Sequence, residues 1–227
     1  PEVELTIFND YLAAPLQVQY PLDHFSELYS LLLGDLPLQT IAPAAPYGIE
    51  ATRHWLAEVG KALGCEAEVA QAVKESWQPM AERWNALRVQ ASRQTLGFVL
   101  AGDAPERLST PGRCHGIPIL EWLAEVGFQL HFLLHEETSD AALPGGEIAR
   151  FSTREELSQQ LTRSPAQTFY TDYYFDRRLA EGGKSQFSLQ FFELGFEGTL
   201  RTAEKLIRIC DVPFFARYGR YGRTAQD

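Results

Sequence analysis

The sequence predicts an α/β fold of parallel sheets flanked by helices, with one partial and one complete unit joined by a long helix. Short apolar runs alternate with stretches of helical periodicity, as in βαβ units. A pentapeptide pattern also occurs twice, at residues 48–52 (Gly-Ile-Glu-Ala-Thr) and 195–199 (Gly-Phe-Glu-Gly-Thr), each time between an apolar run and a helix-like stretch. A glycine that tolerates positive φ, followed by a glutamate that complements a helix N-terminus, is typical of a strand-to-helix corner.

Residues 1–64 are expected to be the C-terminal part of the first unit. Apolar residues at helical spacing predict a helix from Asp23, a plausible N-cap, to Leu33, with Gly34 ending it. The other expected elements are a strand at residues 5–8, a loop at 12–21, a strand at 38–41 and, after the first corner, a helix at 53–63. Residues 65–91 then form a long connecting helix, which Pro79 should kink.

Residues 92–227 are expected to form the second unit, ending in a flexible basic tail at residues 217–223. A strand at residues 96–100 ends in Ala101-Gly102-Asp103, a turn typical of the carboxyl edge of a parallel sheet. Ser152 or Thr153, followed by Glu155 and Glu156, resembles a capping box. Four more helices are expected: one at residues 119–126, one from the capping box to residue 161, a short one within residues 173–181, and one at residues 200–209. Two more strands are expected at residues 128–134 and 167–170.

Composition excludes several classes of function. The 227 residues carry a net charge of −10, which argues against general binding to nucleic acid phosphates or anionic membranes. No apolar run is long enough to span a bilayer. Cys65, Cys114 and Cys210 are too few and too scattered for a disulfide framework, so we expect a reducing cytoplasm.

Familiar cofactor motifs are missing from the sequence. Residues 182–185 (Gly-Gly-Lys-Ser) resemble part of a phosphate loop, but Arg178 stands where that loop needs its first glycine. No Gly-x-Gly-x-x-Gly pattern supports nicotinamide binding. Cys114 and His115 offer two ligands where structural zinc needs four, so we predict no metal site in this chain.

The least ordinary segment is the aromatic run at residues 169–175, which directly follows a predicted strand. Open α/β sheets bind ligands at this edge, aromatic rings stack on flat conjugated molecules, and an aspartate can relay a proton. The alternative is a helix that packs its aromatic residues into the core. The predicted catalytic residues are Asp172 and Asp176, and the predicted substrate-binding residues are Tyr170, Tyr173, Tyr174 and Arg177, the last because a guanidinium binds carboxylates.

Four short segments carry a resemblance to a known family: residues 46–52 (Pro-Tyr-Gly-Ile-Glu-Ala-Thr), 95–102, 122–128 (Trp-Leu-Ala-Glu-Val-Gly-Phe) and 184–189 (Lys-Ser-Gln-Phe-Ser-Leu). Because these segments occur in the same order as in that family, the sequence resembles the component 1 family of nitrogenase and nitrogenase-like reductases. The family includes dark-operative protochlorophyllide reductase and chlorophyllide reductase. The resemblance extends over nearly the whole chain but only the later two-thirds of a family subunit. It implies that both units are Rossmann-like.

The resemblance also implies an activity and partners. An ATP-dependent iron–sulfur reductase would deliver electrons to a complex of homologous component 1 subunits, whose iron–sulfur cluster is held by another segment or a partner chain. By the resemblance, the cysteine and the histidine that hold the catalytic metal cluster in nitrogenase itself would fall at residues 8–10 (Phe-Asn-Asp) and 190–193 (Gln-Phe-Phe-Glu), and neither segment contains a cysteine or a histidine. Their absence favours a tetrapyrrole, as in bacteriochlorophyll biosynthesis, over dinitrogen. Glu193 is added to the predicted substrate-binding residues. The alternatives are a non-catalytic scaffold or carrier for metallocofactor assembly, and a plain binding module.

Overall fold

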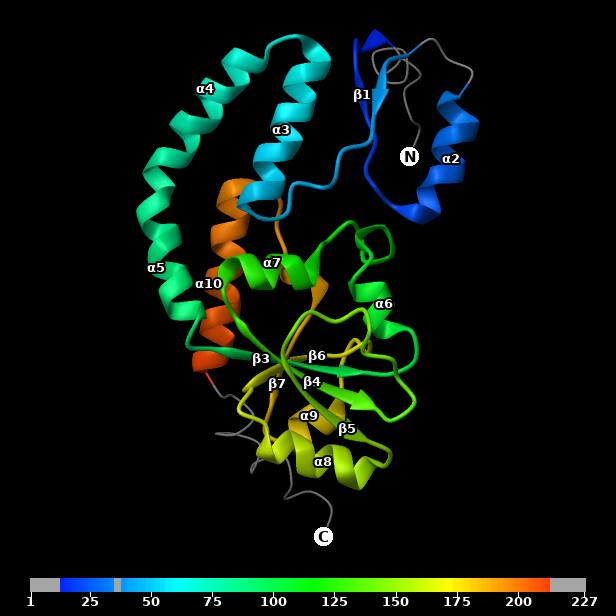
Figure 1. Ribbon diagram of the computed structural model, residues 1–227, viewed down its shortest axis with the longest axis vertical. Helices are drawn as coiled ribbons and strands as arrows, with labels where there is room; N and C mark the ends of the chain where they lie inside the picture. The colour runs from blue at the N-terminus through cyan, green and yellow to red at the C-terminus, as the bar shows by residue number, and fades with distance from the viewer. Residues whose placement is uncertain (1–12, 35–37, 213–227) are drawn as a thin grey trace, which may run out of the picture.

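Five short strands pair into one parallel sheet, in the order β5-β4-β3-β6-β7 (Figure 1). A computed structural model of the chain describes residues 13–34 and 38–212. The strands are β3 (Thr95–Leu100), β4 (Gln129–His135), β5 (Glu147–Phe151), β6 (Thr168–Tyr170) and β7 (Ser185–Phe187). In register, Leu96 of β3 lies opposite Leu130 of β4 and Thr168 of β6. The predicted α/β fold with parallel sheets flanked by helices is therefore confirmed.

Helices cover both faces of this sheet. Side chains alternate along β3, so that Phe98 packs in one hydrophobic cluster and Val99 in the other. The first cluster lies under α5 (Ala81–Ala91), α7 (Ile119–Val126) and α10 (Gly195–Asp211). The second lies under α8 (Arg154–Arg163) and α9 (Arg177–Glu181). Because both faces are buried, residues 96–100 of β3 and 132–134 of β4 are apolar without a break.

The first unit contains a second, much smaller parallel sheet. Its strands β1 (Gln17–Val18) and β2 (Thr40–Ile41) flank α2 (Asp23–Leu33), which has the predicted bounds. The predicted loop at residues 12–21 was wrong at β1, because Gln17 and Val18 pair with β2. Leu22, not Asp23, is the N-cap of α2. The predicted strand at residues 5–8 and the tail at 217–223 lie outside the described residues, and the unit boundaries at 64 and 92 stay a prediction.

The two Gly-x-Glu corners lie side by side and bond to one another. Gly48 and Gly195 have positive φ, 95° and 78°, as the corner predicts. The Gly48 N–H donates to Thr199 Oγ1 at 3.2 Å, and the Gly195 N–H donates to the Pro46 carbonyl at 2.8 Å. The helices start earlier than predicted, α3 (Ile49–Leu63) directly after Gly48 and α10 at Gly195 itself.

The connector is a bent helical arm along the side of the molecule (Figure 1). It consists of α4 (Glu66–Trp77), the 3₁₀ turn η1 (Gln78–Met80) and α5. Pro79 lies in the 3₁₀ turn, as expected for a residue without a backbone N–H. Trp77 then packs against Phe196 of α10, with 5.6 Å between ring centroids, so the arm is tied to the second unit.

Within the second unit, the strongest local signals are confirmed and the weakest elements were missed. Helix α7 has the predicted bounds. Thr153 Oγ1 accepts the Glu156 N–H, as in a capping box, while Glu156 Oε2 reaches back to the N–H of Ser152, one residue before the N-cap. The missed elements are β5, β7, the short helix α6 (Ala104–Leu108) and the 3₁₀ turns η2 (Pro111–Arg113) and η3 (Leu189–Phe191). β5 is an edge strand with three exposed residues, so it lacks an apolar run.

Buried polar side chains fill the amino end of the sheet. Lys184 Nζ donates to the carbonyls of Ser164 and Ala166 at 3.0 and 2.7 Å. His131 Nδ1 lies 2.6 Å from Ser164 Oγ, and burial lowers the pKa of His131. Lys184 therefore holds the backbone together and does not line an open phosphate loop.

No helix of residues 13–34 and 38–212 has the length and apolar character needed to cross a membrane.

Candidate functional site

The strand order identifies where a ligand crevice is expected. From β3 the chain continues to one side of the sheet, into β4 and β5, and from β6 to the other side, into β7. The carboxyl ends of two such neighbouring strands form the topological switch point at which open α/β sheets bind ligands. Helix α6 follows β3 here, and a loop of residues 171–176 follows β6.

An ion pair joins these two connections. Arg107 Nη2 of α6 lies 2.6 Å from Asp172 Oδ1 of the loop, and both side chains are about one-third exposed, at 34% and 38%. The Tyr170 hydroxyl donates to the same carboxylate oxygen at 3.4 Å. Burial and the nearby Asp172 carboxylate raise the pKa of Tyr170, so this hydroxyl keeps its proton. Burial opposes the charge of Arg107, but Asp172 outweighs it and raises the Arg107 pKa.

The segment that follows α6 lies beside this switch point. Burial raises the pKa of Cys114 to about 11, and its thiol is therefore neutral at pH 7. The Tyr20 hydroxyl of the first unit donates to the carbonyl of His115 at 2.8 Å and lies 3.2 Å from the Tyr47 hydroxyl. The first unit thus contacts the carboxyl edge of the large sheet at residues 111–116.

The predicted aromatic cluster divides into a buried and an exposed part. Phe169 and Tyr170 are 0% and 7% exposed, whereas Tyr173, Tyr174 and Phe175 are 62%, 93% and 57% exposed. These last three lie in the loop before α9 and not in a helix. The alternative interpretation, a helix that packs its aromatic residues into the core, is therefore wrong for the exposed three.

Asp176 and Arg178 hold the far end of the loop. Asp176 Oδ1 accepts the Arg178 N–H at 3.0 Å as the N-cap of α9, and Oδ2 lies 2.6 Å from Arg178 Nη2. Although burial opposes its charge, the hydrogen bond from Arg178 lowers the pKa of Asp176. The structure thus places the two predicted catalytic aspartates in one loop, but only Asp172 faces the α6 side. Arg177 is exposed on α9.

Glu193 lies with α10 and is held by that helix. It pairs with Arg201, at 2.7 Å between Oε2 and Nε, and with Lys205. The hydrogen bonds from Lys205 and Arg201 lower the pKa of Glu193. Glu193 is therefore held by ion pairs to α10, whereas Tyr170 and Asp172 are joined to each other by a hydrogen bond.

Sequence reasoning missed Arg107 and Gln186. Gln186 Nε2 of β7 donates to the Tyr173 carbonyl at 2.6 Å, and its Oε1 accepts the Asp176 N–H at 3.0 Å. The turn at Ala101-Gly102-Asp103, which was recognised, indicates that Arg107 follows the carboxyl end of a strand, but only the pairing of β3 with β6 brings it to Asp172.

The described residues do not fit an iron–sulfur cluster. Clusters need several thiolates, and Cys65, Cys114 and Cys210 lie on separate elements without a disulfide. Burial raises the pKa of Cys210 to about 12, so its thiol also stays protonated. Within residues 13–34 and 38–212, no group of three or more His, Cys, Asp or Glu side chains could hold a metal ion.

The fold is similar to solved chains of nitrogenase. No family model matches the sequence, and no curated protein matches it. A chain of "Nitrogenase Cp1 at pH 5" matches with a TM-score of 0.56 and 12% identity over 89% of this chain and 48% of that one. A chain of "Nitrogenase Cp1 at pH 6.5" matches with a TM-score of 0.56 and 10% identity, over 90% and 50%. This chain therefore spans about half of those chains, and the likeness is one of fold.

Proposed function

We propose that this chain is part of a nitrogenase-like component 1 reductase subunit. Such a subunit receives electrons from an ATP-dependent iron–sulfur reductase and reduces a substrate bound beside its Rossmann-like units. The observation that best supports this proposal is the fold likeness to nitrogenase Cp1 over 89% of the chain. The Arg107–Asp172 ion pair at the switch point of the sheet, where Tyr20 of the first unit bonds to the His115 carbonyl, supports it as well.

The substrate that the exposed aromatic loop suits best is a flat conjugated ring, a tetrapyrrole in preference to dinitrogen. Tyr173, Tyr174 and Phe175 are mostly exposed, and aromatic rings stack on conjugated ligands; the Arg178 guanidinium lies 5.2 Å from the centroid of the Tyr173 ring, so Tyr174 and Phe175 are the freer two. Arg177 would pair with a substrate carboxylate. The electrons must reach the substrate through an iron–sulfur cluster. Because the described residues do not fit a cluster, we assign it to another segment or to a homologous partner subunit.

In this proposal Asp172 supplies protons. Reduction of one carbon–carbon double bond takes two electrons, from the reductase, and two protons. Asp172 is a carboxylate in its pair with Arg107, so it would relay protons: it takes each one from hydronium in the solvent, which reaches it because the side chain is 38% exposed, and passes it to the substrate. Arg107 positions the carboxylate, and the neutral Tyr170 hydroxyl orients it from the buried side.

Asp172→Asn tests this role in the anaerobic complex with its reductase, with protochlorophyllide as the substrate. Turnover should fall by roughly 10²–10⁴-fold, the usual share of a general acid, while protochlorophyllide binding measured by absorbance is unchanged. Asp140→Asn is the matched control, because Asp140 pairs with Arg150 at 3.0 Å and is similarly exposed. Equal turnover in both variants would contradict the role of Asp172.

Native mass spectrometry of the anaerobically purified protein tests the assignment to a reductase. A complex of high mass that carries iron and sulfide is expected. A species of 25.6 kDa, or a homodimer without iron, would contradict the proposal and favour the scaffold or carrier for metallocofactor assembly.

A further inference from the structure

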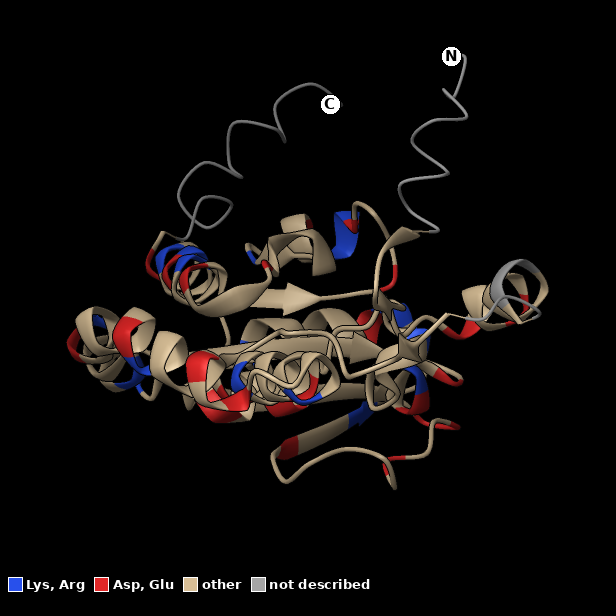
Figure 2. Ribbon diagram, turned by 90° about the horizontal axis from the view of Figure 1, so that it is seen from above, with Lys and Arg blue, Asp and Glu red and all other residues tan. Residues whose placement is uncertain are grey.

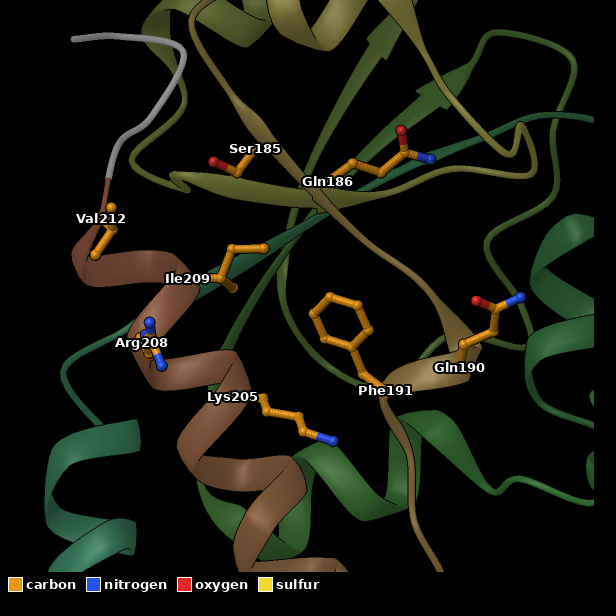
Figure 3. Close-up of a pocket in the computed structure, with 8 residues that line it drawn as sticks. All are labelled: Ser185, Gln186, Gln190, Phe191, Lys205, Arg208, Ile209 and Val212. Atoms are coloured by element: carbon orange, nitrogen blue, oxygen red, sulfur yellow. The ribbon is translucent and has the colours of Figure 1, made fainter. Parts of the chain in front are cut away.

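A groove of about 720 Å³ lies between the edge strand β7 and the last two turns of α10. Figure 3 shows Phe191 of η3 in this groove, with Ile209 and Lys205 reaching from α10. Phe191, Ile209 and Val212 make its apolar wall, and Gln190 lies at one end. A volume in this range is typical of sites for small organic molecules.

The charged residues that line the groove are all positive. Lys205 and Arg208 line it, and no carboxylate does, although the whole chain carries a net charge of −10. Acidic residues occur on α10 but not in the groove: Glu204, near the middle of the helix, pairs with Arg83. Figure 2 shows acidic (red) and basic (blue) residues side by side on the helix that leads to the C-terminal trace. Lys205 pairs with Glu193, whereas within the described residues Arg208 has no carboxylate within ion-pair distance. One guanidinium is thus available for an anion.

We propose that this groove binds an apolar organic anion, a molecule with a hydrophobic body and a carboxylate or sulfonate group. The body would cover Phe191, Ile209 and Val212, which would otherwise stay in contact with water. The anionic group would bind Arg208, whose planar fork matches a carboxylate. Neither Arg107 nor Asp172 lines this groove, and the site does not depend on the proposed reductase activity.

The groove and the aromatic loop share one residue. Gln186 lines the groove and also bonds to the Tyr173 carbonyl and the Asp176 N–H. A ligand in the groove would therefore lie beside the side chain that anchors the exposed aromatic rings. For this reason Gln186 is not a suitable test residue, and the substitutions are confined to α10.

The experiment measures 1-anilinonaphthalene-8-sulfonate fluorescence with the full chain, alongside the uncharged N-phenyl-1-naphthylamine. Arg208→Gln should weaken sulfonate binding by about tenfold, the value of one lost charge-assisted bond, and Arg208→Lys should weaken it less. Binding of the uncharged probe should not change. Lys74→Gln removes an equal charge on the exposed face of α4 and should change neither probe. Arg208 is exposed, so both variants should fold, which thermal unfolding checks.

Competition then separates the possible ligands. Displacement of the sulfonate by protoporphyrin IX identifies a flat carboxylate, and displacement by hexadecanoate identifies an elongated one; either result supports the site when Arg208→Gln weakens that displacement, because the aromatic loop does not contain Arg208. The proposal is overturned if the wild-type chain does not bind the sulfonate. It is also overturned if Arg208→Gln binds it as tightly as wild type does, because exposed apolar surface elsewhere, such as Leu31 of α2, would then explain the signal.

Discussion

The aromatic run at residues 169–175 contains two regions with opposite environments. Phe169 and Tyr170 belong to the sheet and are buried, whereas Tyr173, Tyr174 and Phe175 lie in the following loop and are mostly exposed. Burying a large apolar side chain stabilises a fold by roughly 1.5–3 kcal/mol, and an exposed ring contributes little of this. Folding therefore accounts for the first region and not for the second, whose three adjacent rings form the kind of apolar surface that binds a ligand.

The exposed region is nevertheless well anchored. Gln186 bonds to the loop at the Tyr173 carbonyl and at the Asp176 N–H, and Asp176 caps α9. At the other end, the Arg107–Asp172 ion pair ties the loop to α6. Such anchoring limits the entropy that a ligand would have to remove when it orders the rings.

Phe169→Ala should have the largest effect on stability. The Phe169 side chain is fully buried against Gly97 of β3, where an added Cβ would lie 2.2 Å from the ring. Truncation leaves a cavity between β6 and its neighbours and should lower the free energy of unfolding by about 3–5 kcal/mol. Urea denaturation followed by circular dichroism measures this. A loss below about 1 kcal/mol would contradict the division between the two regions.

Asp176→Asn tests whether charge anchors the exposed region. Asparagine can still cap α9, but it cannot pair with Arg178, so stability at pH 7 should fall by about 1.5–3 kcal/mol. Because the folded-state pKa of Asp176 is below its ordinary value of about 3.9, its contribution is present above that pH and is lost as the pH falls through the folded pKa.

Denaturation of wild type and Asp176→Asn between pH 7 and pH 2 measures that difference. The two curves should converge as the pH is lowered. Asp140→Asn, in an exposed pair with Arg150, is the control and should change stability by less than about 1 kcal/mol. A difference between wild type and Asp176→Asn that stays constant down to pH 2 would show that charge is not the cause.

Local sequence signals predicted the elements that depend on local contacts. The helix at α2 and the helix at α7 have the expected bounds, and Thr153 caps its helix as the spacing indicates. The strands β1, β5 and β7 were missed because two to five residues carry little periodicity, and their pairing partners are remote in the chain.

The difference between local and remote contacts also explains which site residues could be predicted. Asp172, Tyr173 and Tyr174 lie directly after a strand, so their place at the carboxyl edge followed from the sequence. Arg107 did not, because its ion pair with Asp172 depends on β3 and β6 being neighbours. No local pattern indicates that two strands so far apart in the chain will pair.

Gln186→Ala removes the side chain that anchors the loop to β7. It loses the bonds to Tyr173 and Asp176, whose backbone groups can then bind water, so stability should fall by only about 0.5–1.5 kcal/mol. Amide hydrogen exchange in residues 171–176 should accelerate more than exchange in β3. Uniform acceleration across the sheet would show that Gln186 supports the fold as a whole.

Tyr174→Ala should change stability least, by less than about 0.5 kcal/mol, because the side chain is 93% exposed. If this ring serves a ligand, its removal should weaken protochlorophyllide binding by about fivefold to tenfold, the contribution of one aromatic contact. Binding titration followed by absorbance measures this, with Tyr29→Ala on α2 as the control for loss of a tyrosine. Unchanged stability together with unchanged binding would leave the exposed rings without the role proposed for them, whereas a large loss of stability would mean that both regions of the aromatic run serve folding.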